Sequence, residues 1–221
     1  MNLDLELSRK FKKNISHNVK LSNYSWFNLG GPAEHLFKPN SKEQLIQFLK
    51  VNKKNNLDIT ILGAGSNTLI RDNGVKGAVI KLGSNFSNIN LLDKNTIEAG
   101  GATLDRKISN FAKENAIGNL EFLSCIPGSI GGAVIMNSGC YDNDISKVLI
   151  SINVIDIQSC EEKEIKREDI EFSYRGTNLP NHLIITSVKL KGVNLDKNLI
   201  EKKQKKLIEE KKLSQPSQIK T

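Results

Sequence analysis

The chain has 221 residues, 38% of them hydrophobic, and a formal net charge of +8. This length is enough for one large or two small domains. No apolar run approaches the length of a transmembrane helix, and residues 1–13 lack the apolar centre of a signal peptide, so we expect a cytoplasmic protein with no membrane partner.

The cysteines and histidines argue against a metal site. Cys125, Cys140 and Cys160 are odd in number and widely spaced, and they fit neither a zinc pattern nor a disulfide framework. The histidines are His17, His35 and His182, and they show no ligand spacing. We therefore expect free thiols and no bound metal.

The first third of the chain predicts a small α+β unit. Residues 1–20 are polar and predict a loose arm or a short helix, and a Gly-Gly-Pro turn then precedes a short strand at 33–38. Ser41 and Gln44 have the spacing of a capping box, which predicts a helix over 42–55. Further strands are expected at 59–62 and 75–82.

A glycine-rich turn, Gly63-Ala64-Gly65-Ser66-Asn67, lies between two apolar runs that predict buried strands. The two glycines allow positive φ and a close approach of a ligand to the backbone. Successive N–H groups in such a turn form an anion-binding nest, to which the Ser66 hydroxyl and Asn67 amide add donors. The pattern is neither a Walker loop nor a Rossmann fingerprint. It favours a pyrophosphate site, and an ordinary glycine turn is the alternative.

The middle of the chain predicts a second α+β unit. We expect a strand pair within 84–99, turning near residues 93–95, and a helix whose apolar stripe is Leu104, Ile108, Phe111 and Ala112, with Gly118 just beyond its end. Residues 120–139 are too glycine-rich for a core element and too apolar for a surface loop, which suits a backbone lying against a flat ligand. Later strands are expected at 148–157, 160–165 and 183–190, with an aromatic–cation turn at 172–176.

The last part of the chain predicts a lysine-rich amphipathic helix. Its apolar stripe is expected to be Leu195, Leu199, Ile200, Leu207 and Ile208. Clustered lysines can bind nucleic acid, but no aromatic residues are interleaved with them, so we expect no nucleic-acid partner. The predicted organisation is an arm over 1–20, one subdomain over 21–83, a second over 84–191, and a connecting segment over 192–221.

Five motifs in this chain occur in the order found in the UDP-N-acetylenolpyruvoylglucosamine reductase family, and the chain resembles that family over about residues 20–217. The motifs are Trp26-Phe27-x-Leu29-Gly30-Gly31-Pro32-Ala33, Leu62-Gly63-Ala64-Gly65-Ser66-Asn67, Glu121-Phe122-Leu123-x-x-Ile126-Pro127-Gly128-Ser129-Ile130-Gly131-Gly132-Ala133, Met136-Asn137-x-Gly139 and Phe172-Ser173-Tyr174-Arg175.

The resemblance implies a two-subdomain FAD-binding fold of the vanillyl-alcohol-oxidase/PCMH type. It implies an oxidoreductase of peptidoglycan precursor synthesis that reduces UDP-N-acetylenolpyruvoylglucosamine to UDP-N-acetylmuramate, with FAD as cofactor and NADPH as reductant. The partner it implies is the UDP-sugar substrate. Neither the sequence nor the resemblance indicates an oligomeric state.

The resemblance also implies roles for individual residues. Arg175 matches the catalytic arginine of the family, and a guanidinium is suited to an enolpyruvyl carboxylate and the enolate charge that develops from it. The residues expected to bind FAD are Gly63, Ala64, Gly65, Ser66, Asn67, Pro127, Gly128, Ser129, Gly131, Gly132, Asn137 and Ile184.

The chain departs from the family pattern at its end. The family follows Gln-Pro with a serine-containing segment that supplies the proton donor, and with a further domain, whereas this sequence stops at Thr221. The resemblance therefore implies a truncated chain with an open substrate face and poor order after Glu209, and we expect its activity to be absent or very low. A flavin-binding remnant without turnover is the alternative.

Overall fold

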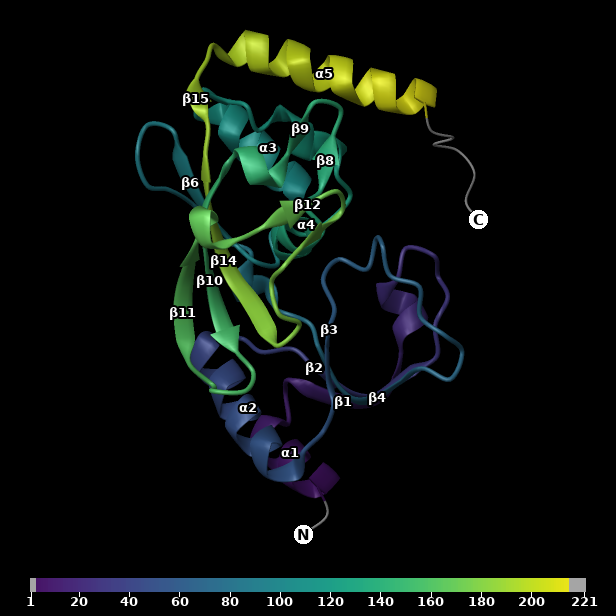
Figure 1. Cartoon of the computed structure of the whole chain (residues 1–221). Helices are drawn as coiled ribbons and strands as arrows, with labels where there is room; N and C mark the ends of the chain where they lie inside the picture. Colours follow the sequence, from purple (N-terminus) through teal and green to yellow (C-terminus); the bar gives the residue numbers. More distant parts are fainter. Residues whose placement is uncertain (1–2, 215–221) are drawn as a thin grey trace.

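A computed structural model describes residues 3–214, and side chains from Leu7 onward (Figure 1). The fold is α+β, as expected, with two sheets that follow one another along the chain. The helices are α1 (Leu3–Phe11), α2 (Lys42–Asn55), α3 (Asp105–Glu114), α4 (Ile130–Ile135) and α5 (Lys197–Ser214).

The first sheet has the strand order β1-β2-β4-β3 and belongs to the first 80 residues. Its strands are β1 (Ile15–Lys20), β2 (Pro32–Phe37), β3 (Ile59–Ile61) and β4 (Val75–Ile80). β1 pairs with β2 in antiparallel register, while β2 and β3 flank β4 in parallel. A loose arm over 1–20 is therefore wrong. The short helix was anticipated, but the edge strand β1 was not, and β3 is likewise an edge strand with an exposed Ile61.

Helix α2 begins and ends as the sequence predicts. The Ser41 side chain accepts a hydrogen bond from the Gln44 N–H at 3.2 Å, which satisfies one of the orphan donors of the first turn. The Gln44 side chain reaches back to the Asn40 N–H at 2.7 Å, one residue earlier than in a standard capping box. Asn56 ends the helix in the left-handed conformation.

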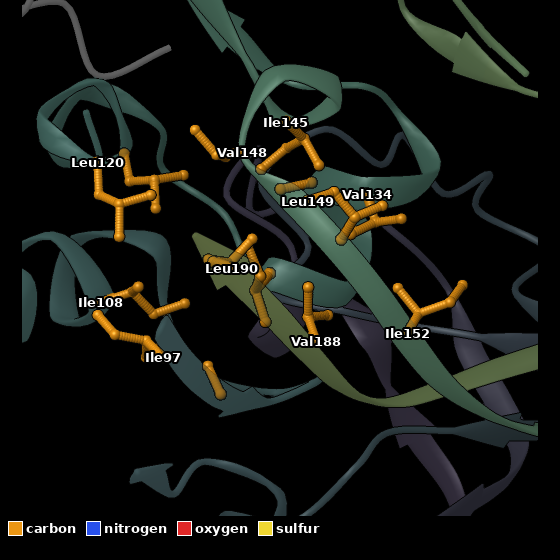
Figure 2. Close-up of a cluster of buried hydrophobic side chains, with 14 of the residues drawn as sticks. Ile97, Ile108, Leu120, Val134, Ile145, Val148, Leu149, Ile152, Val188 and Leu190 are labelled. Carbon is orange, nitrogen blue, oxygen red and sulfur yellow. The ribbon is translucent and has the colours of Figure 1, made fainter. Parts of the chain in front are cut away.

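The second sheet is antiparallel throughout, with the order β11-β10-β14-β6-β5. Its strands are β5 (Ile89–Leu91), β6 (Thr96–Gly100), β10 (Leu149–Asp156), β11 (Glu162–Lys166) and β14 (Leu183–Lys191). Apolar side chains of β6, β10 and β14 pack with those of α3 and α4 into one buried cluster, part of which Figure 2 shows. The labelled residues include Ile97, Ile108, Val134, Ile152 and Val188.

A second buried cluster joins the two sheets. It combines α1, α2, β2 and β4 with Ile155, Cys160 and Ile184 from the second unit. At its centre the rings of Phe37 and Phe48 stack at 4.0 Å between centroids, and Phe11 meets both edge-on. The N-terminal segment thus belongs to the core, because Phe11 and Leu7 are almost fully buried there.

The two long helices of the second half confirm much of the predicted stripes, because Phe111 packs against the core and Ile200 is buried, and they differ from the prediction at single positions. On α3 the buried residues are Asp105, Ile108, Ser109 and Ala112, whereas Leu104 is 45% exposed. Asn115 caps this helix and Gly118 lies in a later strand, so the predicted stop at Gly118 is wrong. The buried face of α3 begins with Asp105, an acid that the prediction omitted because it considered apolar residues only.

Helix α5 lies across the end of the molecule opposite α1 and α2 (Figure 1). Ile200 and Gln204 are buried on it, Leu207 packs against the core of the second sheet, and Leu199 is 48% exposed. The Gln204 amide donates to Ser109 Oγ at 2.7 Å and to the Ser109 carbonyl at 3.0 Å. Leu199 is therefore wrongly placed in the predicted stripe, and Gln204 was missed.

The far end of α5 is anchored as well. The Lys211 ammonium donates to the Cys125 carbonyl, and the helix continues through Ser214. Poor order after Glu209 is thus not what residues 210–214 show, and residues 215–221 lie outside the described residues. Several α5 lysines form ion pairs within the chain, including Lys203 with Glu121 at 3.8 Å.

Short elements complete the fold. The remaining strands are β7 (Ile117–Gly118), β8 (Gly139–Cys140), β9 (Asn143–Asp144), β12 (Phe172–Ser173), β13 (Gly176–Thr177) and β15 (Val193–Asn194). The 3₁₀ turns are η1 (Leu21–Tyr24), η2 (Ser84–Phe86), η3 (Glu121–Cys125), η4 (Ile145–Lys147) and η5 (Arg167–Asp169). Within residues 3–214, no helix has the length and apolar character needed to cross a membrane.

Replacing Ser41 with alanine tests the cap of α2. The variant should lower the free energy of unfolding by about 1 kcal/mol, because the Gln44 N–H loses its acceptor. Urea unfolding followed by circular dichroism measures this. The matched control is Ser16→Ala on the exposed edge of β1, which should change the value by less than about 0.5 kcal/mol. Equal losses in both variants would contradict the capping role.

Candidate functional site

The Gly63–Asn67 loop follows β3 and is held by its neighbours. Leu62 and Ile70 are buried on either side of it, in a third apolar cluster with Leu36 and Val79. The exit run 68–70 is irregular, so the predicted strand after the loop is wrong. The loop is a protrusion anchored at both ends rather than a turn between paired strands.

Gly65 has φ of +72° and tolerates no side chain. A Cβ placed on it would lie 1.9 Å from the Tyr24 carbonyl oxygen, a distance far shorter than any contact that a Cβ atom can make. The Gly65 carbonyl in turn accepts a hydrogen bond from the Trp26 N–H at 3.0 Å. The positive φ that the sequence predicts at this glycine is confirmed, and the reason is the close approach of the segment after η1.

A lysine that sequence reasoning missed also holds this loop. Lys81, just after β4, donates from its ammonium to the Gly63 carbonyl. Burial lowers the pKa of Lys81, and the nearby charge of Lys38 lowers it further. The Lys38 ammonium itself donates to the Tyr24 hydroxyl at 2.9 Å. Two cations thus lie close to a loop that the sequence predicts to bind an anion.

The second predicted segment, 127–132, meets this loop directly. Ser129 is buried, and a Cβ placed on Gly63 would lie 2.7 Å from its Oγ. Ser66 Oγ is similarly within 3.9 Å of the Cβ position on Gly128. The structure therefore brings together two groups of site residues that are more than 60 positions apart in the sequence.

A backbone crossing fixes the 127–132 segment. The Asp105 N–H donates to the Gly128 carbonyl at 3.1 Å, and the Ile130 N–H donates to the Thr103 carbonyl at 2.9 Å. The Gly131 N–H also donates to the Gly101 carbonyl at 3.0 Å. Residues 101–105 and 128–131 thus lie side by side, locked by main-chain hydrogen bonds.

Two buried polar side chains at this crossing were not predicted. Thr103 and Asp105 are fully buried, and within the described residues Thr103 Oγ1 and both Asp105 carboxyl oxygens have no hydrogen-bond partner. Burial raises the pKa of the Asp105 carboxyl well above its ordinary value. The sequence carried one signal for this burial, because Asp105 has helical spacing to Ile108 and Ala112 and so lies on the same face of the helix. The position is unusual, since acids are seldom fully buried.

Asn137 and Arg175 belong to a second part of the site. Asn137, just after α4, donates from its amide to the Ser173 carbonyl at 3.2 Å and accepts from the Ser146 N–H at 3.1 Å. Arg175 is exposed in the tight turn between β12 and β13, with φ of +62° and its guanidinium 5.2 Å from the Tyr174 ring centroid. Asn137 is therefore a support for the Arg175 turn.

Cys125 and Cys140 lie near this turn. Burial and the neighbouring Cys125 thiol raise the pKa of Cys140 to about 11, while the charges of Lys211 and Arg175 oppose the shift. All three cysteines are free thiols, which confirms that prediction. In the described part of the chain, no group of three or more acidic, histidine or cysteine side chains could hold a metal ion.

Ile184 lies on β14, whose Thr186 carbonyl accepts a hydrogen bond from the Gly101 N–H at 2.8 Å. The Ile184 side chain is fully buried in the cluster that joins the two sheets, with Ile155 paired beside it. The remaining predicted residues line the junction in different degrees of exposure: Gly63, Asn67, Pro127 and Gly132 are exposed, and Ala64, Ser66 and Gly128 are half-buried.

Comparisons with known proteins agree with this geometry. A family described as "FAD binding domain" matches residues 33–160. The p-cresol methylhydroxylase structure superimposes with a TM-score of 0.60 at 14% identity, covering 86% of this chain and 43% of that one. The cholesterol oxidase of Brevibacterium sterolicum superimposes with a TM-score of 0.58 at 12% identity, covering 81% of this chain and 38% of that one. The chain is therefore a protein of the vanillyl-alcohol-oxidase/PCMH FAD-binding fold.

Relatives with higher sequence identity show the family to which the chain belongs. The UDP-N-acetylenolpyruvoylglucosamine reductase of Pelagibacter ubique is 43% identical over 99% of this chain and 73% of its own length. The same enzyme of Wolbachia pipientis from Culex pipiens is 38% identical over 93% of this chain and 69% of its own length. The Thermus caldophilus enzyme structure matches with a TM-score of 0.78 and 28% identity, covering 89% of this chain and 69% of that one. The chain belongs to the UDP-N-acetylenolpyruvoylglucosamine reductase family.

The burial of Ile184 generates a prediction that separates packing from ligand binding. Ile184→Val should lower the free energy of unfolding by about 1 kcal/mol, because it removes one buried methylene group. FAD affinity, measured by quenching of flavin fluorescence, should stay within twofold of the parent, or roughly 0.4 kcal/mol. Ile152→Val, which is buried in the other cluster, is the matched control. A loss of FAD affinity in Ile184→Val that Ile152→Val does not show would indicate that the Ile184 side chain contacts the ligand.

Proposed function

We propose that this chain binds FAD and takes part in the reduction of UDP-N-acetylenolpyruvoylglucosamine to UDP-N-acetylmuramate, with NADPH as the reductant. The observation that carries the proposal is the meeting of the Gly63–Asn67 loop with Ser129, in a chain that belongs to this reductase family. The motifs in which the chain resembles the family are the segments that meet in space.

The residues at this junction fit the cofactor. Gly65 has no room for a side chain and holds the positive φ of an anion nest, so the loop can present backbone N–H groups to a diphosphate. Ser66 and Asn67 add hydroxyl and amide donors, and the ammonium of Lys81 at the Gly63 carbonyl contributes positive charge. We assign the diphosphate to this loop, and the remainder of FAD to Pro127, Gly128, Ser129, Gly131 and Gly132.

FAD supplies the hydride in this chemistry, and the chain's own residues position and stabilise what it reacts with. Arg175 is a fixed, always-charged donor exposed at its turn, so it can bind the enolpyruvyl carboxylate and stabilise the negative charge that develops next to it. Asn137 keeps the turn in place through the Ser173 carbonyl. Cys140, whose thiol stays protonated because its pKa is about 11, adds no competing negative charge near Arg175.

Flavin binding and turnover are tested in sequence. FAD is added to the purified chain, unbound FAD is removed by gel filtration, and a retained yellow absorption band supports the proposed cofactor. Oxidation of NADPH that depends on UDP-N-acetylenolpyruvoylglucosamine then supports the reaction. A colourless protein would contradict the whole proposal, and a yellow protein without substrate-dependent oxidation would leave flavin binding without turnover.

Arg175→Ala tests the role of the arginine. Relative to the substrate-dependent turnover that the parent chain shows, the variant should be about 10²–10³-fold lower, as loss of one charge-stabilising donor is in other enzymes. FAD affinity should stay within about twofold, roughly 0.4 kcal/mol, because Arg175 lies outside the diphosphate loop. The change in the flavin spectrum on adding substrate gives a second readout, which should be lost. Arg9→Ala on α1 is the control, and a large loss of FAD affinity in Arg175→Ala would refute the assignment.

A further inference from the structure

The Asp105 carboxyl is the least explained polar group at the junction. It is fully buried at the first residue of α3, and neither oxygen has a partner within the described residues. Thr103, two residues earlier, is also fully buried with its hydroxyl unpartnered. A buried polar group without a hydrogen bond destabilises a fold, and two such groups beside each other call for a specific explanation.

These two side chains lie at the proposed cofactor site. Asp105 Oδ2 is 2.8 Å from the Cβ position on Gly128, and Ser66 Oγ is 3.9 Å from the same point. The backbone of Thr103 and Asp105 is hydrogen-bonded to Ile130 and Gly128. The carboxyl and the Ser66 hydroxyl thus lie near the same residue, Gly128, of the 127–132 segment.

Among residues 7–214, whose side chains the structure describes, no cation pairs with this carboxyl. The 126–136 segment, which Asp105 contacts at Gly128, and the 63–70 segment, which meets it at Ser129, contain no ionisable residue. Arg106 and Lys107 on its own helix are exposed, and the Lys81 ammonium is bonded to the Gly63 carbonyl. On η3 and α5, Glu121 pairs with Lys203, and Lys211 bonds to the Cys125 carbonyl. Burial alone therefore sets which form of the carboxyl is stable, and it favours the protonated acid.

We propose that Asp105 binds FAD as a neutral carboxylic acid, donating a hydrogen bond to an oxygen of the diphosphate or ribityl chain, with the Thr103 hydroxyl as a second donor. This rests on the proposed cofactor. A carboxylate at the same place would face the diphosphate as a like charge in a buried setting, whereas a carboxylic acid offers an O–H donor.

Proton linkage gives the proposal a measurable consequence. If only the neutral acid binds FAD, affinity is constant below the pKa of the free protein's Asp105 and falls about tenfold per pH unit above it. Deprotonation of Lys81, whose pKa burial lowers, also weakens anion binding at high pH. The Asp105 contribution is the part of the pH dependence that disappears when this residue can no longer ionise.

The experiment measures FAD affinity by flavin fluorescence quenching from pH 5 to 9 in four proteins. Asp105→Asn keeps an N–H donor and should bind FAD with a flatter pH profile than the parent. Asp105→Leu keeps the number of heavy atoms and the branch at Cγ but removes the donor, and should bind about tenfold more weakly at low pH. Glu114→Gln, at the exposed end of the same helix, removes one negative charge away from the junction and should keep the parent's pH profile. Thermal unfolding of the free proteins checks that each variant folds.

The outcomes separate the two proposals. Parent protein that binds no FAD overturns both the cofactor assignment and the role of Asp105. Parent protein that binds FAD while Asp105→Asn and Asp105→Leu match it at every pH overturns the role of Asp105 alone. Affinity that rises with pH and is lost in Asp105→Asn also overturns it, because that pattern belongs to an ionised carboxylate that accepts a hydrogen bond. Should the leucine variant not fold, the pH profile of the asparagine variant decides.

Discussion

The site depends on one main-chain crossing, in which residues 101–105 run beside 128–131. Glycine is required there because the approach is so close: a Cβ on Gly101 would lie 2.1 Å from the Ile185 carbonyl oxygen, and one on Gly131 would lie 2.9 Å from the Gly101 carbonyl oxygen. The three hydrogen bonds of the crossing leave no freedom for the 127–132 segment to slide. Ser129 is consequently held where the Gly63–Asn67 loop can reach it.

The loop is delivered to that place by the core that the two sheets share. β3 and β4 belong to the first sheet, yet the cluster around Phe37 and Phe48 also contains Ile155 and Ile184 from the second. Burial of these large apolar groups stabilises the joint arrangement of the sheets. Lys42 adds an ion pair to Glu162 across the same boundary, at 2.7 Å. A ligand bound at the junction of the loop and the 127–132 segment therefore meets two surfaces that are already fixed relative to each other.

Much of this was predictable from local signals. The capping box gave correct bounds for α2, and the motif order gave the family and the two segments that meet. The errors fall where tertiary packing overrides a local pattern. β1 is a polar segment that becomes a strand only because β2 offers it a partner, and the run after Asn67 is apolar because Ile70 anchors the loop in the core. Pattern alone cannot separate an anchor from a strand.

Family resemblance located residues and implied their roles, and the structure adds the contacts that their side chains make within the chain. Asn137 was expected to contact the cofactor, which stays a prediction, and its amide is hydrogen-bonded to Ser173 and Ser146. Ile184 was expected to contact the cofactor too, and its side chain is sealed in the core. Both residues still matter to the site, one by supporting the Arg175 turn and the other by joining the sheets.

Helix α4 gives this support a mechanical meaning. Its first residue follows Ser129, which touches the diphosphate loop, and its last carbonyl, on Ile135, accepts a hydrogen bond from Thr177 in the strand after Arg175. A short, buried helix thus connects the proposed cofactor surface with the proposed catalytic arginine. A displacement at either end would be transmitted to the other, because a packed helix moves as a unit rather than bending between its ends. The contact of Ser129 with the Gly63–Asn67 loop and the Thr177 hydrogen bond beside Arg175 are thus joined through one short helix.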